Sequence, residues 1–419
     1  MKNIDSTLKN IIDKTYLKPI GYQPSSNMIF KNYNKEIFDE DMCIYIHIPF
    51  CEKRCSFCSF FSTINYTEES LEYYTNAVIN EINLYSKLIF GKKKVKSIHF
   101  GGGTPTLMST DNLKRIIATI FEKYDTSEIE EITIEANPAS LDEKKILEFS
   151  KISNLKINIG VQTFNNNILK CINRKNDVTH ILRIIELIKN SNITNFGIDL
   201  ICGLPDSSIE TCEKDIDYAF KLKPDLITLY PLWIEKNTSL GQSIEKQKKY
   251  YEQYYQKREI FKHINKILLK NGYEKKSIYH WTIKGKENFI YGQKQMKGGE
   301  WLGIGAGAGS YISEMSFNNI SNVEKYIKTL LKNNLAIDDI YYINSQQRFL
   351  RNINYSLRFP QMDLNCFRDI YGDILVDSLN KKITYLQKIN LLEISNNIIK
   401  LTYDGILNLN YVERYITED

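Results

Sequence analysis

Several features that would assign this chain to a common protein class are missing from its sequence. No apolar run is long enough to span a membrane, and the first residues do not form a secretory signal peptide. The eight cysteines are not spaced in the pairs that are typical of a disulfide framework. No internal repeat is present. These absences predict a protein of the reducing cytoplasm with no membrane span.

The chain also lacks an excess of charge of one sign. Its 55 Lys and Arg residues and 50 Asp and Glu residues give a formal net charge of +5 over 419 residues. Lysines alternate with glutamates along the expected helices, which indicates solvated helix faces and not a nucleic-acid-binding surface. We therefore expect a globular protein with no nucleic-acid partner.

What the sequence does contain is a compact cysteine motif. An apolar strand over Cys43–Ile48 leads into a loop that carries Cys51, Cys55 and Cys58 with C-x3-C-x2-C spacing. Thiolates held this close are suitable ligands for a [4Fe–4S] cluster, which takes four ligands. The next candidate position is Phe60, so one iron would stay open for a non-protein ligand. The alternatives are a structural zinc loop, disfavoured because the remaining cysteines are scattered singly, and three reduced core cysteines.

Short apolar strands alternate with helical stretches over residues 41–232. The expected strands are Cys43–Ile48, Val95–Phe100, Glu131–Glu135, Lys156–Val161, Phe196–Ile201 and Leu226–Tyr230. The expected helices cover 67–90, 109–124, 141–151, 165–189 and 207–222. This alternation predicts an α/β fold with a parallel sheet and right-handed crossovers. Six units favour an incomplete (β/α)6 TIM-like barrel over a closed eightfold barrel.

Every unusual motif follows the carboxyl end of one of these strands, where parallel barrels carry their chemistry. The motifs are the cysteine loop, Gly101–Pro105, Glu135–Pro138, Gly160–Phe164, Asp199–Pro205 and Tyr230–Leu232. We therefore expect them to form one shared site.

Each motif also has a structural interpretation. The three consecutive glycines let a backbone approach a ligand, or form a tight turn. Glu135 and Asp199 could bind ribose hydroxyls or balance a sulfonium cation, or serve as a helix N-cap or a surface ion pair. Gln162 and Arg174 could both reach the mouth of the barrel, unless Arg174 is an exposed surface arginine. Tyr45 lies on the strand face that we expect to look into the barrel.

In order and spacing, these motifs resemble the coproporphyrinogen dehydrogenase and heme chaperone branch of the radical S-adenosylmethionine (SAM) superfamily. The matching segments are Y-x-H-I-P-F-C-x3-C-x-F-C, G-G-G-T-P, I-E-A-N-P, G-V-Q-T-F-N and D-L-I-x-G-L-P, and the resemblance covers about residues 40–410. It implies a [4Fe–4S] cluster on the three cysteines and two SAM molecules. By motif position, the SAM on the cluster would be held by Tyr45, Gly102 and Glu135. The second SAM would be held by Phe57, Gly103, Thr104, Gln162, Arg174, Asp199 and Pro231.

Within this branch, two departures bear on the function. Phe60 stands where the similar dehydrogenases have a fourth cysteine, and the H-N-x-x-Y-W segment of the heme chaperones is missing. Instead, the segments Ser277–Trp281, Glu287-Asn288 and Leu302–Ser310 resemble anaerobic heme-degrading anaerobilin synthases. That resemblance implies a radical SAM C-methyltransferase that opens the heme macrocycle to a linear tetrapyrrole and releases iron, a route of iron acquisition in an anaerobic cell.

The resemblance also implies the order of the chemistry and the partners. A low-potential donor such as flavodoxin or ferredoxin would reduce the cluster, which cleaves the first SAM. The resulting radical would take hydrogen from the methyl group of the second SAM, and the new carbon radical would add to heme, the substrate. The alternatives are a heme chaperone that transfers heme without degrading it, an oxygen-independent coproporphyrinogen III oxidase-like enzyme, and a methyltransferase of another flat heterocycle.

Two further sequence features have open roles. His280 beside Trp281 suits a heme pocket, as an iron ligand or a proton donor, and equally suits a structural histidine. The glycine-rich segment over 302–310 could let backbone approach a ligand, or form a tight strand and loop.

The remaining chain is divided by composition and pattern. Residues 1–40 are expected to form an N-terminal arm with one short helix over 8–17, residues 41–232 the radical SAM core, and residues 233–336 a substrate cover. Residues 337–419, with helices and then a hairpin across Asn396-Asn397, predict a small, mainly helical, winged-helix-like C-terminal domain. It lacks a concentrated basic face, so we expect it to pack against the barrel and not to bind DNA.

Overall fold

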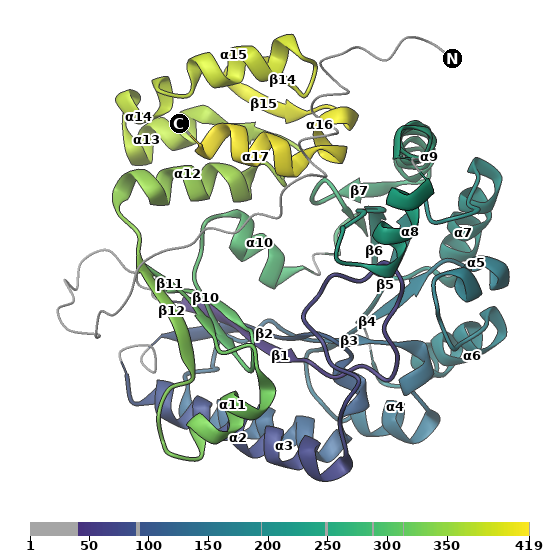
Figure 1. Ribbon diagram of the computed structural model, residues 1–419, viewed down its shortest axis with the longest axis vertical. Coiled ribbons are helices and arrows are strands. Elements are labelled where there is room, and N and C mark those ends of the chain that lie inside the picture. Colours follow the sequence, from purple (N-terminus) through teal and green to yellow (C-terminus); the bar gives the residue numbers. More distant parts are fainter. Residues whose placement is uncertain are drawn as a thin grey trace.

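The computed structural model describes residues 41–88, 93–193, 195–247, 250–286, 289–312 and 314–418 (Figure 1). The N-terminal arm over 1–40, with its expected helix, and the pair Glu287-Asn288 lie outside the described residues. None of the helices in the described ranges has the length and apolar character that a membrane span requires.

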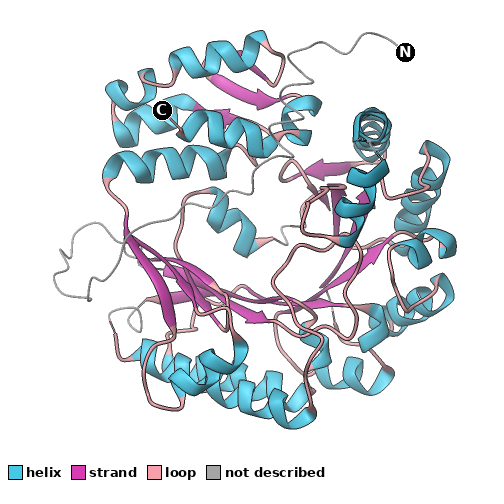
Figure 2. Ribbon diagram, viewed as in Figure 1, coloured by secondary structure: helices cyan, strands magenta, loops and turns pink. Residues whose placement is uncertain are grey.

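The fold is built on a twelve-stranded sheet with strand order β12-β11-β10-β9-β1-β2-β3-β4-β5-β6-β8-β7. The six expected parallel strands are confirmed as neighbours in chain order. They are β1 (Asp41–Ile48), β2 (Lys94–Gly102), β3 (Glu131–Ala136), β4 (Leu155–Gln162), β5 (Asn195–Cys202) and β6 (Leu226–Pro231). Helices cover the outer face of this curved sheet, and the C-terminal helices lie across its open side (Figure 2). The α/β incomplete barrel is therefore confirmed.

The crossover helices also follow the sequence pattern, with one exception. They are α2 (Glu68–Ser86), α3 (Thr110–Lys123), α4 (Glu143–Phe149), α5 (Asn166–Cys171), α6 (Val178–Lys189) and α7 (Ile209–Leu222). The single helix expected over 165–189 is wrong, because α5 and α6 are separated by a loop. Asn173 in that loop has a left-handed φ of 66°, and the Asp177 side chain caps α6 by accepting from the His180 amide at 2.8 Å.

The region over 233–336 contributes strands to both edges of the sheet, which the sequence analysis did not predict. On one side, β9 (Trp301–Ile304) pairs in parallel with β1, and β10 (Gly309–Ile312) and β11 (Met315–Asn319) follow antiparallel. The edge strand beyond β11, β12 (Ile337–Tyr342), comes from the residues that were assigned to the C-terminal domain. On the other side, β8 (His280–Ile283) pairs antiparallel with β6, and β7 (Tyr273–Lys275) with β8. The helices of this region are α8 (Ser239–Gln247), α9 (Tyr250–Lys270), α10 (Ile290–Met296) and α11 (Val323–Leu330). Its role as a substrate cover stays a prediction.

The two faces of β1 explain why the barrel interior can carry a site. Ile44, Ile46 and Ile48 are fully buried in the core between the sheet and the outer helices. Alternate residues point to the opposite face of a strand, so Tyr45 and His47 look into the barrel. The apolar face stabilises the fold, and the inward face is left for polar groups.

After β12, the C-terminal residues form helices and then a hairpin, as expected. The helices are α12 (Ser345–Ser356), α13 (Leu364–Tyr371), α14 (Asp373–Asp377), α15 (Asn380–Lys388), α16 (Tyr403–Leu407) and α17 (Leu409–Thr417). Of these, α14 and the two helices that follow the hairpin, α16 and α17, were not predicted. The strands β13 (Met362–Asp363), β15 (Ile398–Leu401) and β14 (Leu392–Ser395) form a small sheet. Asn396 and Asn397 have φ values of 51° and 62°, the left-handed pair that a two-residue hairpin turn needs.

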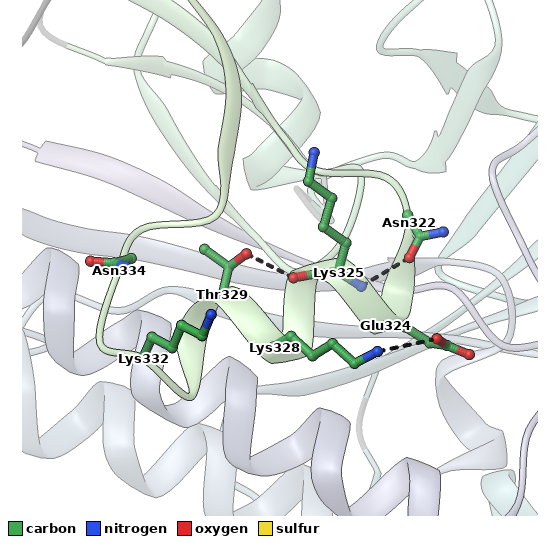
Figure 3. A pocket seen from close by; sticks show the side chains of 7 residues that line it. All are labelled: Asn322, Glu324, Lys325, Lys328, Thr329, Lys332 and Asn334. Atoms are coloured by element: carbon green, nitrogen blue, oxygen red, sulfur yellow. Dashed lines mark hydrogen bonds and ion pairs between the residues drawn. The ribbon is translucent and has the colours of Figure 1, made fainter.

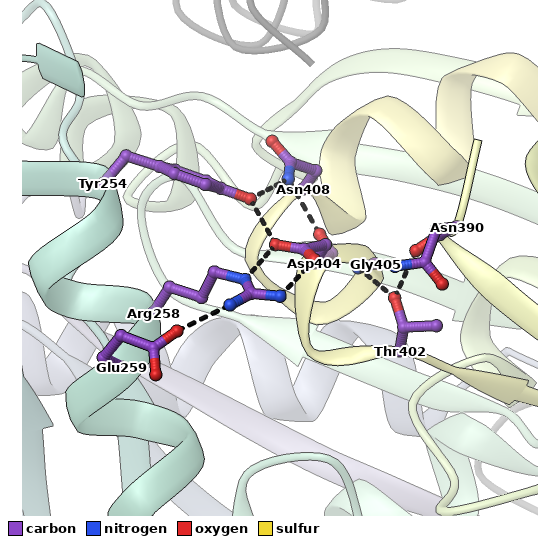
Figure 4. A network of polar contacts seen from close by, with 8 residues as sticks. All are labelled: Tyr254, Arg258, Glu259, Asn390, Thr402, Asp404, Gly405 and Asn408. Atoms are coloured by element: carbon purple, nitrogen blue, oxygen red, sulfur yellow. Dashed lines mark hydrogen bonds and ion pairs between the residues drawn. The ribbon is translucent and has the colours of Figure 1, made fainter. Parts of the chain in front are cut away.

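A buried polar network joins this domain to the barrel (Figure 4). The Asp404 carboxylate on α16 accepts from Arg258 Nε at 2.6 Å and Nη2 at 2.9 Å, and from Tyr254 Oη at 3.0 Å. Asn408 donates to Tyr254 Oη at 2.8 Å. Because Tyr254 and Arg258 belong to α9, the network fixes how the domain packs on the barrel.

We expect Asp404→Ala to lower the free energy of unfolding by about 2–3 kcal/mol, because it leaves a half-buried arginine and a buried tyrosine without their acceptor. Denaturant unfolding followed by circular dichroism measures this loss. The matched control is Glu324→Gln on α11, whose ion pair with Lys328 is exposed and should contribute less than about 0.5 kcal/mol. Equal effects of the two substitutions would contradict the assignment of Asp404 as a domain anchor.

Candidate functional site

The cysteine loop leaves the carboxyl end of β1 and is held by a bond within the loop and by two other parts of the fold. Within the loop, the Cys51 amide donates to Thr63 O at 2.9 Å. The Ser56 amide donates to Ile172 O after α5 at 3.2 Å, and Ser56 O accepts from the Leu240 amide on α8 at 2.9 Å. The loop is therefore fixed by backbone bonds and not by its thiols.

The thiols of Cys51, Cys55 and Cys58 are half-buried on this loop, and no disulfide involves them. Thr104 Oγ1 donates to Cys51 Sγ at 3.6 Å, and desolvation raises the pKa of Cys58 above its usual range. In the described ranges, no three His, Cys, Asp or Glu side chains converge as a single metal ion would require. The thiolates of a cubane bind three different irons and stand further apart. Three thiolates on one loop match the donor set of a [4Fe–4S] cluster with one open iron and are one ligand short of a structural zinc site, so the donor set fits the cluster better than zinc.

The loop and the strand ends enclose one cavity, here called the strand-end cavity. The predicted site residues that line it are Cys51, Cys55, Phe57, Cys58, Gly102, Gly103, Thr104, Glu135, Gln162, Arg174 and Asp199. These residues come from the ends of β1 to β5 and the loops after them, as expected for a parallel barrel. Tyr45, Pro231 and His280 are not among the residues that line the cavity.

The glycine loop after β2 is both a tight turn and part of the cavity wall. Gly102 has a φ of +106°, and a side chain there would meet the His47 ring at 2.4 Å. A side chain on Gly103 would meet Phe50 O at 2.6 Å. Only glycine lets β2 end this close to the cysteine loop.

The side chains of Gln162 and Arg174 both lie next to Gly160 and line the strand-end cavity, so both reach the mouth of the barrel. Gln162 has a left-handed φ of 69°, and Arg174 Nη2 donates to Gly160 O at 3.0 Å. Arg174 Nε is buried and has no hydrogen-bond partner in the described structure. Arg174 is therefore not an exposed surface arginine, and its free donor is available to a ligand.

The two carboxylates of the cavity have different partners. Glu135 Oε1 pairs with His99 Nε2 at 3.0 Å, and Asn158 Nδ2 donates to both oxygens of Asp199 at 2.9 Å. Desolvation raises the pKa of Asp199 to about 6. Among the described residues, neither side chain caps a helix or pairs with a lysine or arginine, and the one ion-pair geometry, between Glu135 and His99, lies inside the barrel. The ligand-binding interpretation is therefore favoured over a surface ion pair or a helix cap.

Tyr45 lies in an aromatic wall inside the barrel. Its ring stacks on His99 and Tyr291 with centroid distances of 5.9 and 5.8 Å. His47 Nε2 faces Phe61 O at 3.1 Å and therefore carries the proton, so Nδ1 accepts from Tyr45 Oη at 3.0 Å. Burial lowers the pKa of His47, which keeps the ring neutral. This wall connects β1, β2 and α10.

His280 on β8 is held as a core residue. Its Nδ1 faces Ser277 Oγ at 2.6 Å, and its ring stacks on Phe289 with a centroid distance of 3.6 Å. Desolvation lowers its pKa to about 3, so it is neutral at physiological pH and cannot donate a proton as imidazolium. These contacts favour the structural interpretation, and a role toward heme stays a prediction.

The glycine-rich segment over 302–310 forms the tight strand and loop between β9 and β10. A side chain on Gly303 would meet Gly309 O at 2.3 Å, and the Gly305 amide donates to the buried Glu81 carboxylate at 2.8 Å. None of its residues lines the strand-end cavity.

Pro105, Ala136, Asn137 and Gly160 also line the strand-end cavity and lie in the motifs that were expected to share one site, whereas Lys53, Arg54, Ser62 and Asn158 line it without having been singled out from the sequence. The sequence analysis also assigned Phe60 no role beyond not being a cysteine. Two signals were available. Lys53 and Arg54 lie between the first two cluster cysteines, and Asn158 is two residues before Gly160 on the same strand face.

A second hollow lies over α11 and shares no residue with the strand-end cavity (Figure 3). It is lined by Asn322, Glu324, Lys325, Lys328, Thr329, Lys332 and Asn334. Its side chains are exposed or half-buried, and Lys328 pairs with Glu324. These features are typical of a solvated helix face.

Comparison with known proteins agrees with this geometry. The model of the radical SAM superfamily matches residues 45–219. Heme chaperone HemW of Lactococcus lactis is 28% identical over 85% of this chain and 96% of its own length. Heme chaperone HemW of Buchnera aphidicola subsp. Schizaphis graminum is 32% identical over 67% of this chain and 73% of its own length. Anaerobilin synthase of Escherichia coli O157:H7 is 29% identical over 68% of this chain and 64% of its own length.

Among solved structures, coproporphyrinogen III oxidase (HemN) from Escherichia coli, a radical SAM enzyme, has a TM-score of 0.76. The likeness covers 90% of both chains at 20% sequence identity and shows a shared fold. The matched sequence model, the relatives and the fold lead to one conclusion. The chain belongs to the radical SAM superfamily, in the branch that contains HemW and HemN.

Proposed function

We propose that this protein binds heme next to a [4Fe–4S] cluster and SAM in the strand-end cavity. Family membership implies the cluster and SAM, and heme is proposed from the names of the relatives. The observation that carries the proposal is the single cavity, which joins the three thiols to the polar ends of the neighbouring strands. Parallel barrels bind ligands at this edge.

Different residues of the cavity would bind the cluster and SAM. Cys51, Cys55 and Cys58 would hold three irons, and the fourth would accept SAM. Gly102 and Glu135 would hold that SAM through backbone and carboxylate. When bound, the cluster supplies the electron that cleaves SAM. The protein would fix the ligands in place, because the strand that leads into the cysteine loop, β1, is paired on both sides with β2 and β9.

Among heme functions, we propose that of a heme chaperone first. The match to HemW of Lactococcus lactis extends over 96% of that protein, and the match to anaerobilin synthase over 64% of that enzyme. A correspondence over nearly the whole length includes the C-terminal domain and not only the barrel. A chaperone would bind heme and transfer it intact.

Heme opening by a radical SAM C-methyltransferase is the second candidate, and two observations favour it. The chain lacks the H-N-x-x-Y-W segment, and His280, the histidine that was considered for a heme pocket, is packed in the barrel core. In addition, most residues assigned to a second SAM line the same cavity as the cysteines: Phe57, Gly103, Thr104, Gln162, Arg174 and Asp199. A second SAM is the methyl source that such an enzyme requires.

Anaerobic incubation of the reconstituted protein with heme, SAM and dithionite separates the two functions. For a chaperone, we expect one heme per chain, a shifted Soret band that persists, and heme transfer to an apo-acceptor protein. Loss of the Soret band with release of iron and a linear tetrapyrrole would contradict the chaperone function and support heme opening by a C-methyltransferase. Absence of heme binding would contradict both.

Cys55→Ala should remove one cluster ligand and lower the bound iron and sulfide to below about one quarter of the wild-type content. It should also abolish the release of 5′-deoxyadenosine from SAM. The matched control is Cys366→Ala, because Cys366 is exposed on the C-terminal domain. Iron analysis and chromatography of the SAM products measure both effects. Full iron content in Cys55→Ala would contradict the assignment of the loop.

The raised pKa of the Asp199 carboxyl predicts that SAM binding depends on pH. Burial raises its pKa to about 6, so the carboxyl is protonated below this pH and ionised above it. Only the ionised form accepts two ribose hydroxyls, so we expect SAM affinity to rise with pH through 6 and to fall up to about tenfold per unit below it. Equilibrium dialysis with labelled SAM measures this profile. Asp199→Asn should bind weakly without the step, and a step that persists in this variant would assign it to another group.

A further inference from the structure

The rim of the strand-end cavity differs in chemistry from its interior. Phe60 lines the cavity, yet its side chain is 68% exposed. Lys53 and Arg54 line the same rim and are exposed. The carboxylates of Glu135 and Asp199 belong to the strand ends. An exposed aromatic ring and two cations thus line the same cavity, a combination that suits a flat ligand with negative charge.

The two rim cations are not neutralised by the loop. Lys53 has no hydrogen bond or ion pair in the described ranges, and Arg54 donates only to Ser62 O, at 3.0 Å. The acid of the loop, Glu52, is already paired with Lys175. Arg54 therefore keeps most of its guanidinium donors free for a carboxylate.

The rim is also held in place before any ligand binds. Asn173 Nδ2 donates to Arg54 O at 2.8 Å, and the Cys58 amide donates to Cys55 O at 3.2 Å. A loop that is already ordered loses less conformational entropy when it binds a ligand.

We propose that Phe60, Lys53 and Arg54 form the recognition surface for a planar macrocycle that carries two carboxylates. The ring would stack on Phe60, and the carboxylates would pair with Lys53 and Arg54. This inference rests on the proposed function and names the groups of heme that these side chains would bind, its two propionates. It also orients the macrocycle with its propionates at the rim and its ring toward the SAM residues.

The experiment compares heme with heme dimethyl ester, in which both propionates are blocked. Anaerobic titrations follow the Soret band of reconstituted wild type and of the Lys53→Gln/Arg54→Gln double variant. We expect wild type to bind heme about tenfold more tightly than the ester, from two exposed ion pairs. The double variant should bind heme and ester equally. Phe60→Ser should weaken both ligands by about the same factor, since it removes only the stacking surface.

The controls test the loop itself and the matched side chains. Each variant must keep the wild-type iron content and SAM affinity. Lys170→Gln and Phe121→Ser change an exposed lysine and an exposed phenylalanine that do not line the cavity, and should leave heme affinity unchanged.

If wild type binds heme but the double variant still prefers heme to the ester, the recognition surface is wrong and the proposed function stands. If heme affinity is unchanged and only reduction by an acidic redox protein is lost, the rim is a protein docking surface instead. If wild type does not bind heme, the proposed function itself fails.

Discussion

The structure depends on how the end of β1 is held. This strand is paired on both sides, with β2 and β9, and its three isoleucines are fully buried. The His47 ring packs directly on Gly102, so the position of the glycine loop and that of the cysteine loop are set together. Because a shift of one residue would turn Tyr45 and His47 toward the helices, the register of β1 decides whether the site exists.

A buried hydrogen-bond network next to β1 also holds the end of this strand in place. Glu81 on α2 accepts hydrogen bonds from the Gly305 amide, from Tyr326 Oη and from Asn319 Nδ2. Tyr74 Oη donates to His47 O at 2.7 Å and accepts from the Ala306 amide at 2.9 Å. Burial raises the pKa of Glu81 to about 8, an electrostatic cost that its three donors offset in part. The added strand β9 is thereby fixed to the strand that carries the cysteines.

The strand-end cavity, by contrast, contains polar groups whose bonding is incomplete. Arg174 Nε and Asn158 Oδ1 are buried without a partner in the described structure, and Asp199 is an acid with a raised pKa. Such groups destabilise an empty site and favour a polar ligand that completes their hydrogen bonds. The barrel core supplies the stability that this arrangement costs. A domain anchored through Asp404 covers the open side.

Much of this could be predicted from the sequence, because local patterns and motif positions carry it. The six parallel strands follow from short β-branched runs, and the shared site from motifs at their ends. The break between α5 and α6 was missed because it depends on a left-handed Asn173 that also bonds to the cysteine loop. Apart from the strand and loop offered for 302–310, strands β7 to β12 were missed because they are stabilised by pairing with residues that are distant in the sequence or by short antiparallel contacts at the sheet edges. The burial of His280 against Phe289 is a tertiary contact that no local pattern reveals.

Whether one iron of the cluster is open to SAM can be tested directly by electron–nuclear double resonance. The sample is the reduced, reconstituted protein with SAM labelled with nitrogen-15 at its amino group. If three loop thiolates leave one iron open, the labelled nitrogen should couple to the cluster spin as a direct iron ligand. A cluster spectrum that does not change when SAM is added, with no nitrogen coupling, would contradict the account.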